Sequence, residues 1–259
     1  MNLTITTWNV NSIKMRIDHL REYVTVNDPD ILLLQELKCE TAKFPADALS
    51  DLPYNFYVHG QKSYNGVAIL SKFRADEIKL DFPANPAPEQ ARFIEILAHT
   101  SIGYCRIISL YAPNGGEVAS AKFELKLQFY NALINYLEKV KNFDEKIIIG
   151  GDFNIAPFDI DVHSPSDLTN TICCTNQEKQ KIREIFNIGF DDLYRLFHPQ
   201  KQEFSWWDYR AGAFERNKGL RIDFILSSHN ASSHFSKASI DYKMREKIKS
   251  SDHAPVMIF

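Results

Sequence analysis

The sequence has few cysteines, little net charge and no long run of apolar residues. Its four cysteines show no spacing typical of a zinc site or a disulfide framework, which favours a reducing compartment. No signal peptide or membrane-spanning stretch is visible, because the chain starts directly on the strand-like residues 3–8. These absences argue against a disulfide-stapled secreted domain and a membrane protein, so we expect a soluble, cytoplasmic protein.

The charge composition excludes a protein that binds nucleic acid through its overall charge. Thirty basic and 33 acidic residues leave a net charge of −3, so a local basic patch must meet any anionic partner. The apolar fraction of 44% is enough for a sizeable core. No composition break or flexible linker divides the chain, and we therefore expect a single domain over residues 1–259.

The apolar periodicity predicts many short strands and a few long amphipathic helices. Strands are expected over residues 3–8, 31–34, 55–59, 66–70, 92–96, 105–110, 147–149, 222–226 and 256–259. Helices are expected over residues 13–24 with Ser12 as N-cap, over 123–137, and over 182–186 with a stop at Gly189. Residues 155–178 are expected to form a long loop. This pattern suits two sheets packed face to face with helices outside.

One apolar strand leads directly into polar residues and suggests a site at its end. Residues 147–149 are isoleucines, typical of a strand buried on both faces, and Gly150 and Gly151 after them allow a sharp turn. Asp152 and Asn154 are two positions apart, so in an extended chain they point to the same side. An Asx-rich turn that merely closes the strand explains this stretch equally well.

Polar residues also accompany other predicted strands. They are Asn9, Glu36, Tyr111, Asp223 and the adjacent pair Asp252 and His253. Taken singly, most of them are as well explained as turn, capping or packing residues. Asp223 differs because it lies within an apolar strand, where a carboxylate is costly unless it is paired. A histidine elsewhere in the chain is a natural partner.

Five short motifs run through the chain: TWNVNS at 7–12, LQELK at 34–38, GGDFNIAP at 150–157, GLRID at 219–223 and SDHAP at 251–255. Together they resemble the exonuclease III and AP endonuclease branch of the endonuclease/exonuclease/phosphatase superfamily. The segment FSWWDYR at 204–210, followed by GLR at 219–221, is specific to the DNA-repair branch. The resemblance implies a four-layer α/β sandwich of two mixed, mainly antiparallel sheets. It also implies hydrolysis of DNA phosphodiesters at abasic sites and at 3′ ends, as a 3′–5′ exodeoxyribonuclease and 3′-phosphodiesterase or phosphatase.

The resemblance implies a divalent metal and a general base. Glu36 is a hard oxygen ligand suited to Mg²⁺, for which Mn²⁺ is a possible substitute, and Asn9 and Asp252 complete the site directly or through water. Asp152 holds and deprotonates the attacking water, with His253 as the alternative base.

The resemblance also implies that the remaining catalytic residues act on the phosphate. Asn154 orients water or phosphate without adding negative charge. Asp223 accepts a hydrogen bond from His253 and favours its imidazolium form, which faces the phosphate. Tyr111 donates to a phosphate oxygen or to the leaving group.

The implied substrate is double-stranded DNA with an abasic site or a 3′ end, bound by a monomer that is nucleoid-associated if the source is bacterial. Residues expected to contact the DNA backbone are Lys62, Tyr64, Asn65, Arg92, Arg210, Arg216 and Arg221. Trp206, Leu220 and Ile222 match positions that form the wall of the pocket for a flipped-out abasic sugar. Trp206 could equally belong to the core, and Trp207 is expected there.

The predicted loop over residues 155–178 departs from a DNA-binding composition. It contains no lysine or arginine, but it does contain the acidic residues Asp159, Asp161, Asp167 and Glu178. In the family this region lies near the DNA. Whether abasic-site cleavage or 3′-end processing dominates is therefore left open.

Two other functions compete with a DNA-repair nuclease. A phosphodiesterase for lipid or inositol phosphates has the same fold, but it does not need the segment 206–221, and no membrane-binding apolar stretch is visible. A catalytically dead DNA-binding or scaffold domain would have lost some of the polar set by drift. Retention of the full set favours an active nuclease.

Overall fold

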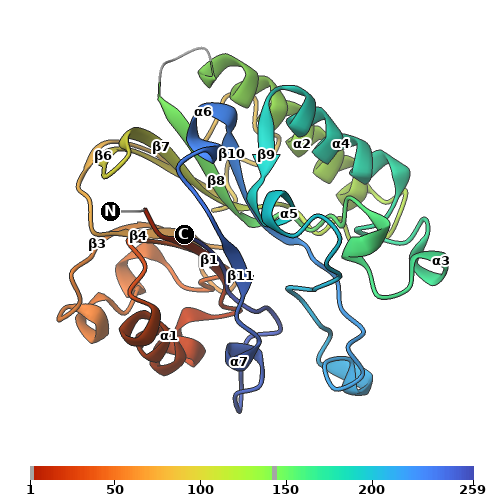
Figure 1. Ribbon diagram of the computed structural model, residues 1–259, viewed down its shortest axis with the longest axis horizontal. Coiled ribbons are helices and arrows are strands. Elements are labelled where there is room, and N and C mark those ends of the chain that lie inside the picture. The colour runs from red at the N-terminus through yellow and green to blue at the C-terminus, as the bar shows by residue number, and fades with distance from the viewer. Residues whose placement is uncertain (1–2, 142–144) are drawn as a thin grey trace.

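The computed structural model describes residues 3–141 and 145–259. Two six-stranded sheets pack face to face, and helices cover their outer faces (Figure 1). The strand order is β11-β12-β1-β2-β4-β3 in the first sheet and β5-β6-β7-β8-β10-β9 in the second. The predicted four-layer α/β sandwich is confirmed.

The strands are short, as the periodicity predicts. The first sheet contains β1 (Ile5–Asn9), β2 (Ile31–Gln35), β3 (Asn55–His59), β4 (Val67–Ser71), β11 (Ala238–Ile240) and β12 (Val256–Ile258). The second contains β5 (Ala75–Lys79), β6 (Phe93–Thr100), β7 (Gly103–Tyr111), β8 (Lys146–Asp152), β9 (Phe190–Asp192) and β10 (Asp223–Ser228). Three strands were not predicted: β5 is mostly polar, and β9 and β11 have only three residues each, so none of them shows a clear apolar pattern.

Three long helices form the outer layers, with α1 on the first sheet and α2 beside α4 on the second (Figure 1). The α-helices are α1 (Ile13–Asn27), α2 (Ala121–Val140), α3 (Pro165–Leu168), α4 (Asn176–Asn187), α5 (Leu193–Phe197), α6 (His229–Ser232) and α7 (Tyr242–Arg245). Short 3₁₀ turns are η1 (Thr41–Lys43), η2 (Ala46–Leu49), η3 (Asp159–Asp161) and η4 (Arg210–Gly212). Within the described residues, no helix is both long and apolar enough to span a bilayer.

Two local predictions about helix ends differ from the structure. Ser12 occupies the predicted N-cap position of α1, but its φ is 90° and its side chain makes no capping hydrogen bond. Residues 155–178 are not a continuous loop, since they include η3, α3 and the start of α4. Thr175 and Glu178 form a capping box that begins α4 earlier than its apolar periodicity suggests. The predicted stop at Gly189 is confirmed by its φ of 101°.

The central strand β8 is buried on both faces, as predicted. Ile148 belongs to the core between the two sheets, whereas Ile147 and Ile149 pack into the layer under α2 and α4. Gly150 and Gly151 do not form a turn, because both lie within β8. A Cβ on Gly150 would lie 2.4 Å from a Leu33 methyl carbon, and one on Gly151 would lie 1.9 Å from a backbone oxygen. These glycines therefore permit close packing rather than a change of direction.

Two parallel strand pairs bring polar residues to one end of the sandwich. β1 pairs in parallel with β2, and β7 pairs in parallel with β8, with Tyr111 opposite Asp152. β10 runs antiparallel to β8 and places Asp223 opposite the same Asp152. The carboxyl ends of four strands and the start of a fifth thus meet at one edge.

Candidate active site

His253 and Asp223 form a buried pair at the start of β10. Nδ1 of His253 donates to Oδ2 of Asp223 over 2.9 Å, and both side chains are almost fully buried. The hydroxyl of Ser205 donates to the same carboxylate oxygen over 2.6 Å and accepts the backbone N–H of Asp223. His253 is thus the histidine partner that the buried carboxylate required.

Asp152, Glu36 and Asn9 lie on the other side of the imidazole. Nε2 of His253 is 3.8 Å from Oδ2 of Asp152. The amide nitrogen of Asn9 donates to both carboxylates, over 3.0 Å in each case. One ligand atom each from Glu36, Asp152 and His253 lie within 4.8 Å of one another. The carboxylate oxygens of Glu36 and Asp152 in this cluster are hard donors that can hold a divalent cation.

Burial and neighbouring charges set the protonation of this cluster. Burial raises the pKa of Asp152, and the His253 cation opposes it only in part. Burial alone would lower the pKa of His253, but Asp223 and Asp152 reverse that effect and raise it. Burial would also raise the pKa of Glu36, yet neighbouring hydrogen-bond donors bring it below its usual value. The site combines an ionised carboxylate, an imidazolium and a carboxylate of raised proton affinity.

The other two residues predicted to complete the metal site are oriented differently. The side-chain oxygen of Asn9 accepts the N–H of Asn11 over 3.0 Å, so its nitrogen faces the carboxylates. The two oxygens of Asp252 accept from Nε1 of Trp206 over 3.0 Å and from Asn11 over 2.9 Å. Within the described residues, Asp252 does not belong to the ligand cluster, and the oxygen of Asn9 is turned away from it toward Asn11. Of the two predicted modes, this arrangement favours contact with a metal through water.

Asn154 is joined to Asp152 by a tight turn. Its φ is 50°, and its backbone N–H donates to Oδ1 of Asp152 over 2.9 Å. Its side-chain nitrogen donates to the carbonyl of Ala112, and its side-chain oxygen accepts from Asn114, over 3.0 Å each. The extended geometry expected for these two residues is therefore wrong. They form the alternative Asx turn, and both still line one pocket.

Tyr111 connects the ligand cluster to a partly buried arginine. Its hydroxyl donates to Oε1 of Glu36 over 2.9 Å, and burial beside carboxylates raises the pKa of the phenol well above its usual value. The guanidinium of Arg92 lies 4.9 Å from the ring centroid and donates to the Tyr111 carbonyl over 3.3 Å. Tyr111 is thus held as a neutral donor.

These polar residues share a cavity of about 300 Å³ with an apolar wall. The cavity is lined by Glu36, Tyr111, Asn114, Asp152, Asn154, Ile172, Cys173, Trp206, Leu220, Ile222, Asp252 and His253. Trp206 therefore faces the pocket, while Trp207 is fully buried in the core. Sequence reasoning missed Asn114, Ile172 and Cys173. The NGG turn after Tyr111 was a weak signal for Asn114, but nothing local marked the other two.

The residues predicted to contact DNA lie in different settings. Lys62, Tyr64, Arg210 and Arg216 are exposed, and Asn65 is half-buried. Arg210 is engaged by Asp208 in an exposed ion pair at 2.6 Å. These side chains remain available to a DNA backbone.

Arg221 corrects the predicted set of DNA contacts. Its side chain is fully buried, and its guanidinium donates to Asp161 over 2.7 Å and to Asp192 over 2.7 Å. Its backbone N–H also donates to the Asp161 carbonyl. Arg221 therefore ties the segment around η3 to β9 and the pocket wall, and it does not face solvent.

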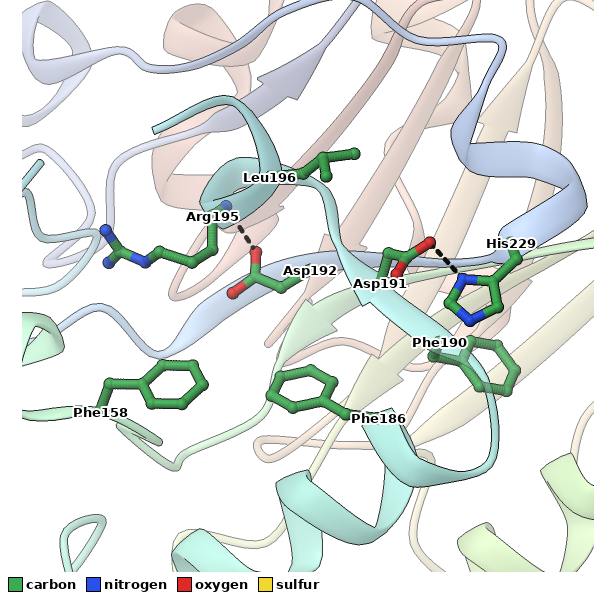
Figure 2. Close-up of a pocket in the computed structure, with 8 residues that line it drawn as sticks. All are labelled: Phe158, Phe186, Phe190, Asp191, Asp192, Arg195, Leu196 and His229. Atoms are coloured by element: carbon green, nitrogen blue, oxygen red, sulfur yellow. Dashed lines mark hydrogen bonds and ion pairs between the residues drawn. The ribbon is translucent and has the colours of Figure 1, made fainter. Parts of the chain in front are cut away.

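Two other described cavities lack this chemistry. One, of about 350 Å³, lies beside β9 and is shown in Figure 2. Its Phe158 and Phe186 rings stack with an interplanar angle of 9°, and Asp191 there is paired with His229. The other, of about 740 Å³, is mostly apolar and lies between β3 and β5. Neither holds the carboxylate and imidazole cluster.

Comparison with known proteins gives consistent matches along the whole chain. A model of the Endonuclease/Exonuclease/phosphatase family matches residues 6–253. The protein is 33% identical over 257 residues to exodeoxyribonuclease III of Haemophilus influenzae, spanning 96% of each chain. A 3′ phosphatase from Neisseria bound to a product DNA hairpin has a TM-score of 0.95 and 37% identity, covering 99% of this chain and 98% of that one. An AP endonuclease from Archaeoglobus fulgidus has a TM-score of 0.93 and 34% identity, with the same coverage.

Proposed function

The chain belongs to the endonuclease/exonuclease/phosphatase family and to its exonuclease III branch, and we propose that it hydrolyses DNA phosphodiesters at abasic sites and at 3′ ends. We further propose that residues 1–259 form one catalytic domain that acts as a monomer. With DNA as its substrate, the enzyme is expected in the cytoplasm, associated with the nucleoid if the source is bacterial.

The observation that carries this proposal is the grouping of Asp152, His253 and Asp223 beside an apolar wall. A phosphodiester is anionic, so its hydrolysis needs a base for water and a cation for the phosphate. Asp152 has the raised proton affinity of a base, and His253 is held as the cation by Asp223. The side chains of Leu220 and Ile222 give a sugar without a base a dry surface.

The roles of the residues follow from their positions. Asp152 takes a proton from the attacking water as the bond between phosphorus and the leaving oxygen breaks. His253 and the amide of Asn154 donate to the phosphate oxygens, where negative charge increases in the transition state. Tyr111 remains a neutral phenol, and its single O–H, which donates to Glu36 in the free enzyme, turns to donate to the phosphate or to the leaving oxygen when substrate is bound.

The ligand cluster fits a divalent metal. Glu36 is ionised and contributes a hard oxygen, with Asp152 beside it, a set that suits Mg²⁺, with Mn²⁺ as a possible substitute. Asn9 and Asp252 would reach such a metal through bound water. When bound, the metal supplies positive charge that offsets the charge of the phosphate.

Exposed basic residues in two separate segments supply contacts to the DNA backbone. We assign this role to the segment with Lys62, Tyr64 and Asn65, and to the loop with Arg210 and Arg216. Arg92 acts closer to the chemistry, through Tyr111. Because residues 155–178 carry no lysine or arginine, we expect 3′-end processing to be at least as prominent as abasic incision.

One gel assay tests the proposal. A duplex with one internal abasic site and a duplex with a 3′-recessed end are incubated with and without Mg²⁺, beside Asp152→Asn as the inactive control. The proposal predicts metal-dependent cleavage of both by the wild type only. Hydrolysis of a phosphoinositide headgroup with no cleavage of either DNA would contradict it.

A further inference from the structure

Helix α2 reaches the end of β8 with two side chains one turn apart. Tyr130 donates its hydroxyl to the carbonyl of Phe153, and Lys126 donates to the carbonyl of Asn154 over 2.7 Å. Positions i and i+4 share one helix face, so a single face holds two consecutive carbonyls. We propose that Lys126 is a positioning residue that holds Asn154 and Asp152 in their reactive geometry. This inference rests on the proposed function and adds a residue to it.

The ammonium of Lys126 is fully buried, and all of its N–H groups donate hydrogen bonds. It donates to the carbonyl of Asn114 over 3.0 Å, to that of Asn154, and to the carboxylate of Glu178. A lysine ammonium has three N–H donors, and each finds an acceptor. The alkyl stem is enclosed too, since a Cβ on Gly115 would lie 3.0 Å from its Cδ.

Glu178 carries the charge opposite to that of Lys126, and its carboxylate oxygens also accept several other hydrogen bonds. Besides Lys126, its oxygens accept the backbone N–H of Cys173 over 3.0 Å and the N–H and hydroxyl of Thr175 over 3.0 and 2.7 Å. Cys173 lines the catalytic cavity. The ion pair therefore joins α2, the Asn154 turn and the pocket segment ahead of α4.

The contacts of Lys126 lead directly to the reacting groups. Asn154 is in the left-handed region, and the N–H of the same residue orients Oδ1 of Asp152. Asn114, the other carbonyl partner, donates to the side-chain oxygen of Asn154. A shift of either carbonyl therefore moves the base and the phosphate-facing amide together.

Stability alone does not account for this ion pair. A buried salt bridge is often no more stabilising than well-packed apolar residues of similar volume. Here the lysine adds two hydrogen bonds, to the carbonyls of Asn114 and Asn154, that an apolar residue cannot make. Its distinctive contribution is therefore to orientation.

The test replaces both charges by apolar side chains of similar size, Lys126→Met with Glu178→Met, so that no buried charge is left unpaired. We expect kcat on the abasic duplex to fall about 10- to 100-fold while KM changes less than about twofold, because small misplacements of reacting groups are costly. The matched control is Lys72→Met. Lys72 also binds a carbonyl and carboxylates, but at the opposite end of β2 from the site, so its kcat should be unchanged.

A second variant separates orientation from stability. Glu178→Gln keeps Lys126 and both of its carbonyl bonds, so kcat should stay within about threefold of wild type even where the melting temperature falls. A loss of kcat in all variants in proportion to lost stability, Lys72→Met included, would overturn the proposal. So would a double variant with wild-type kcat.

The side-chain amide resonances of Asn154 give a readout that needs no substrate. They should shift in the double variant and stay in place in Lys72→Met. If the wild type cleaves no DNA, the proposed function fails, but these resonances still decide the positioning role. Unshifted resonances would reject it.

Discussion

His253 and Asp152 face each other with the imidazole Nε2 3.8 Å from the carboxylate Oδ2. The cation lowers the pKa of Asp152, which burial otherwise raises. Both residues were candidates for the general base. Because its carboxylate partners raise the pKa of His253, the imidazole is protonated at neutral pH. This relationship supports Asp152 as the base and His253 as the cation.

The first prediction follows from the sign of this coupling. In His253→Gln the cation is lost, so the pKa of Asp152 rises further and its ionised form appears only at higher pH. The acid limb of kcat/KM against pH should therefore shift to higher pH than in wild type, measured with saturating Mg²⁺ at every pH. A limb that stays in place, or moves to lower pH, would assign the base elsewhere.

The second prediction concerns the metal. Glu36→Gln removes the ionised ligand from the cluster, so half-maximal activity should require a higher Mg²⁺ concentration, and raised metal should partly restore the rate. A magnesium titration of kcat measures this. Glu40→Gln, at a half-buried carboxylate that forms an ion pair with Lys43, is the control and should titrate like wild type. Identical titrations of Glu36→Gln and wild type would refute the assignment.

The third prediction tests whether Asp223 and His253 act as a unit. Asp223→Asn and His253→Asn should each lower kcat by on the order of 10²-fold, as loss of a transition-state donor does. The double variant should be little worse than either, because residues in one hydrogen-bonded unit share a single contribution. Single-turnover rates of the wild type, the two single variants and the double variant complete this double-mutant cycle. Effects that multiply would show that the two residues act independently.

The fourth prediction concerns Ser205, which holds Asp223 from behind. Ser205→Ala leaves a carboxylate oxygen and two backbone N–H groups of a buried site without this partner. We expect a loss of about 1–3 kcal/mol in the free energy of unfolding and a lower kcat. Urea unfolding measures the first quantity, and the exposed Ser236→Ala is the control. Unchanged stability would mean that water replaces the hydroxyl without cost.

The fifth prediction concerns the acidic segment at residues 155–178. Asp159 and Asp167 are exposed there, so replacing both by lysine adds cations where a duplex would pass. Abasic incision should rise more than 3′-end trimming, and the salt dependence of binding should steepen by about 0.9 per phosphate contacted. Lysines at Asp76 and Glu77, on the far edge strand β5, give the same change in net charge as a control. If neither activity changes, this segment does not face the DNA.

The sequence alone determined the local chemistry and the fold class. Apolar runs predicted the strands that lead to Glu36, Tyr111 and Asp152, because side-chain periodicity and burial are local properties of a strand. The polar residues associated with those strands were therefore recognisable as one set. The need of Asp223 for a partner also followed from sequence, since a carboxylate in an apolar strand is costly unless it is paired.

Only the tertiary structure decided which side chains meet. The sequence predicted that Arg221 contacts DNA. In the structure its buried guanidinium is paired with Asp161 and Asp192, which are 60 and 29 residues away in the chain. Lys126 likewise looks like an ordinary helix lysine in the sequence. Only the packing of α2 against the end of β8 shows that it binds the carbonyl of Asn154. Hydrogen bonds between distant segments depend on how whole layers pack, and no local pattern encodes them. The sequence therefore predicts the reacting groups, whereas the packing of the sandwich determines what holds them in place.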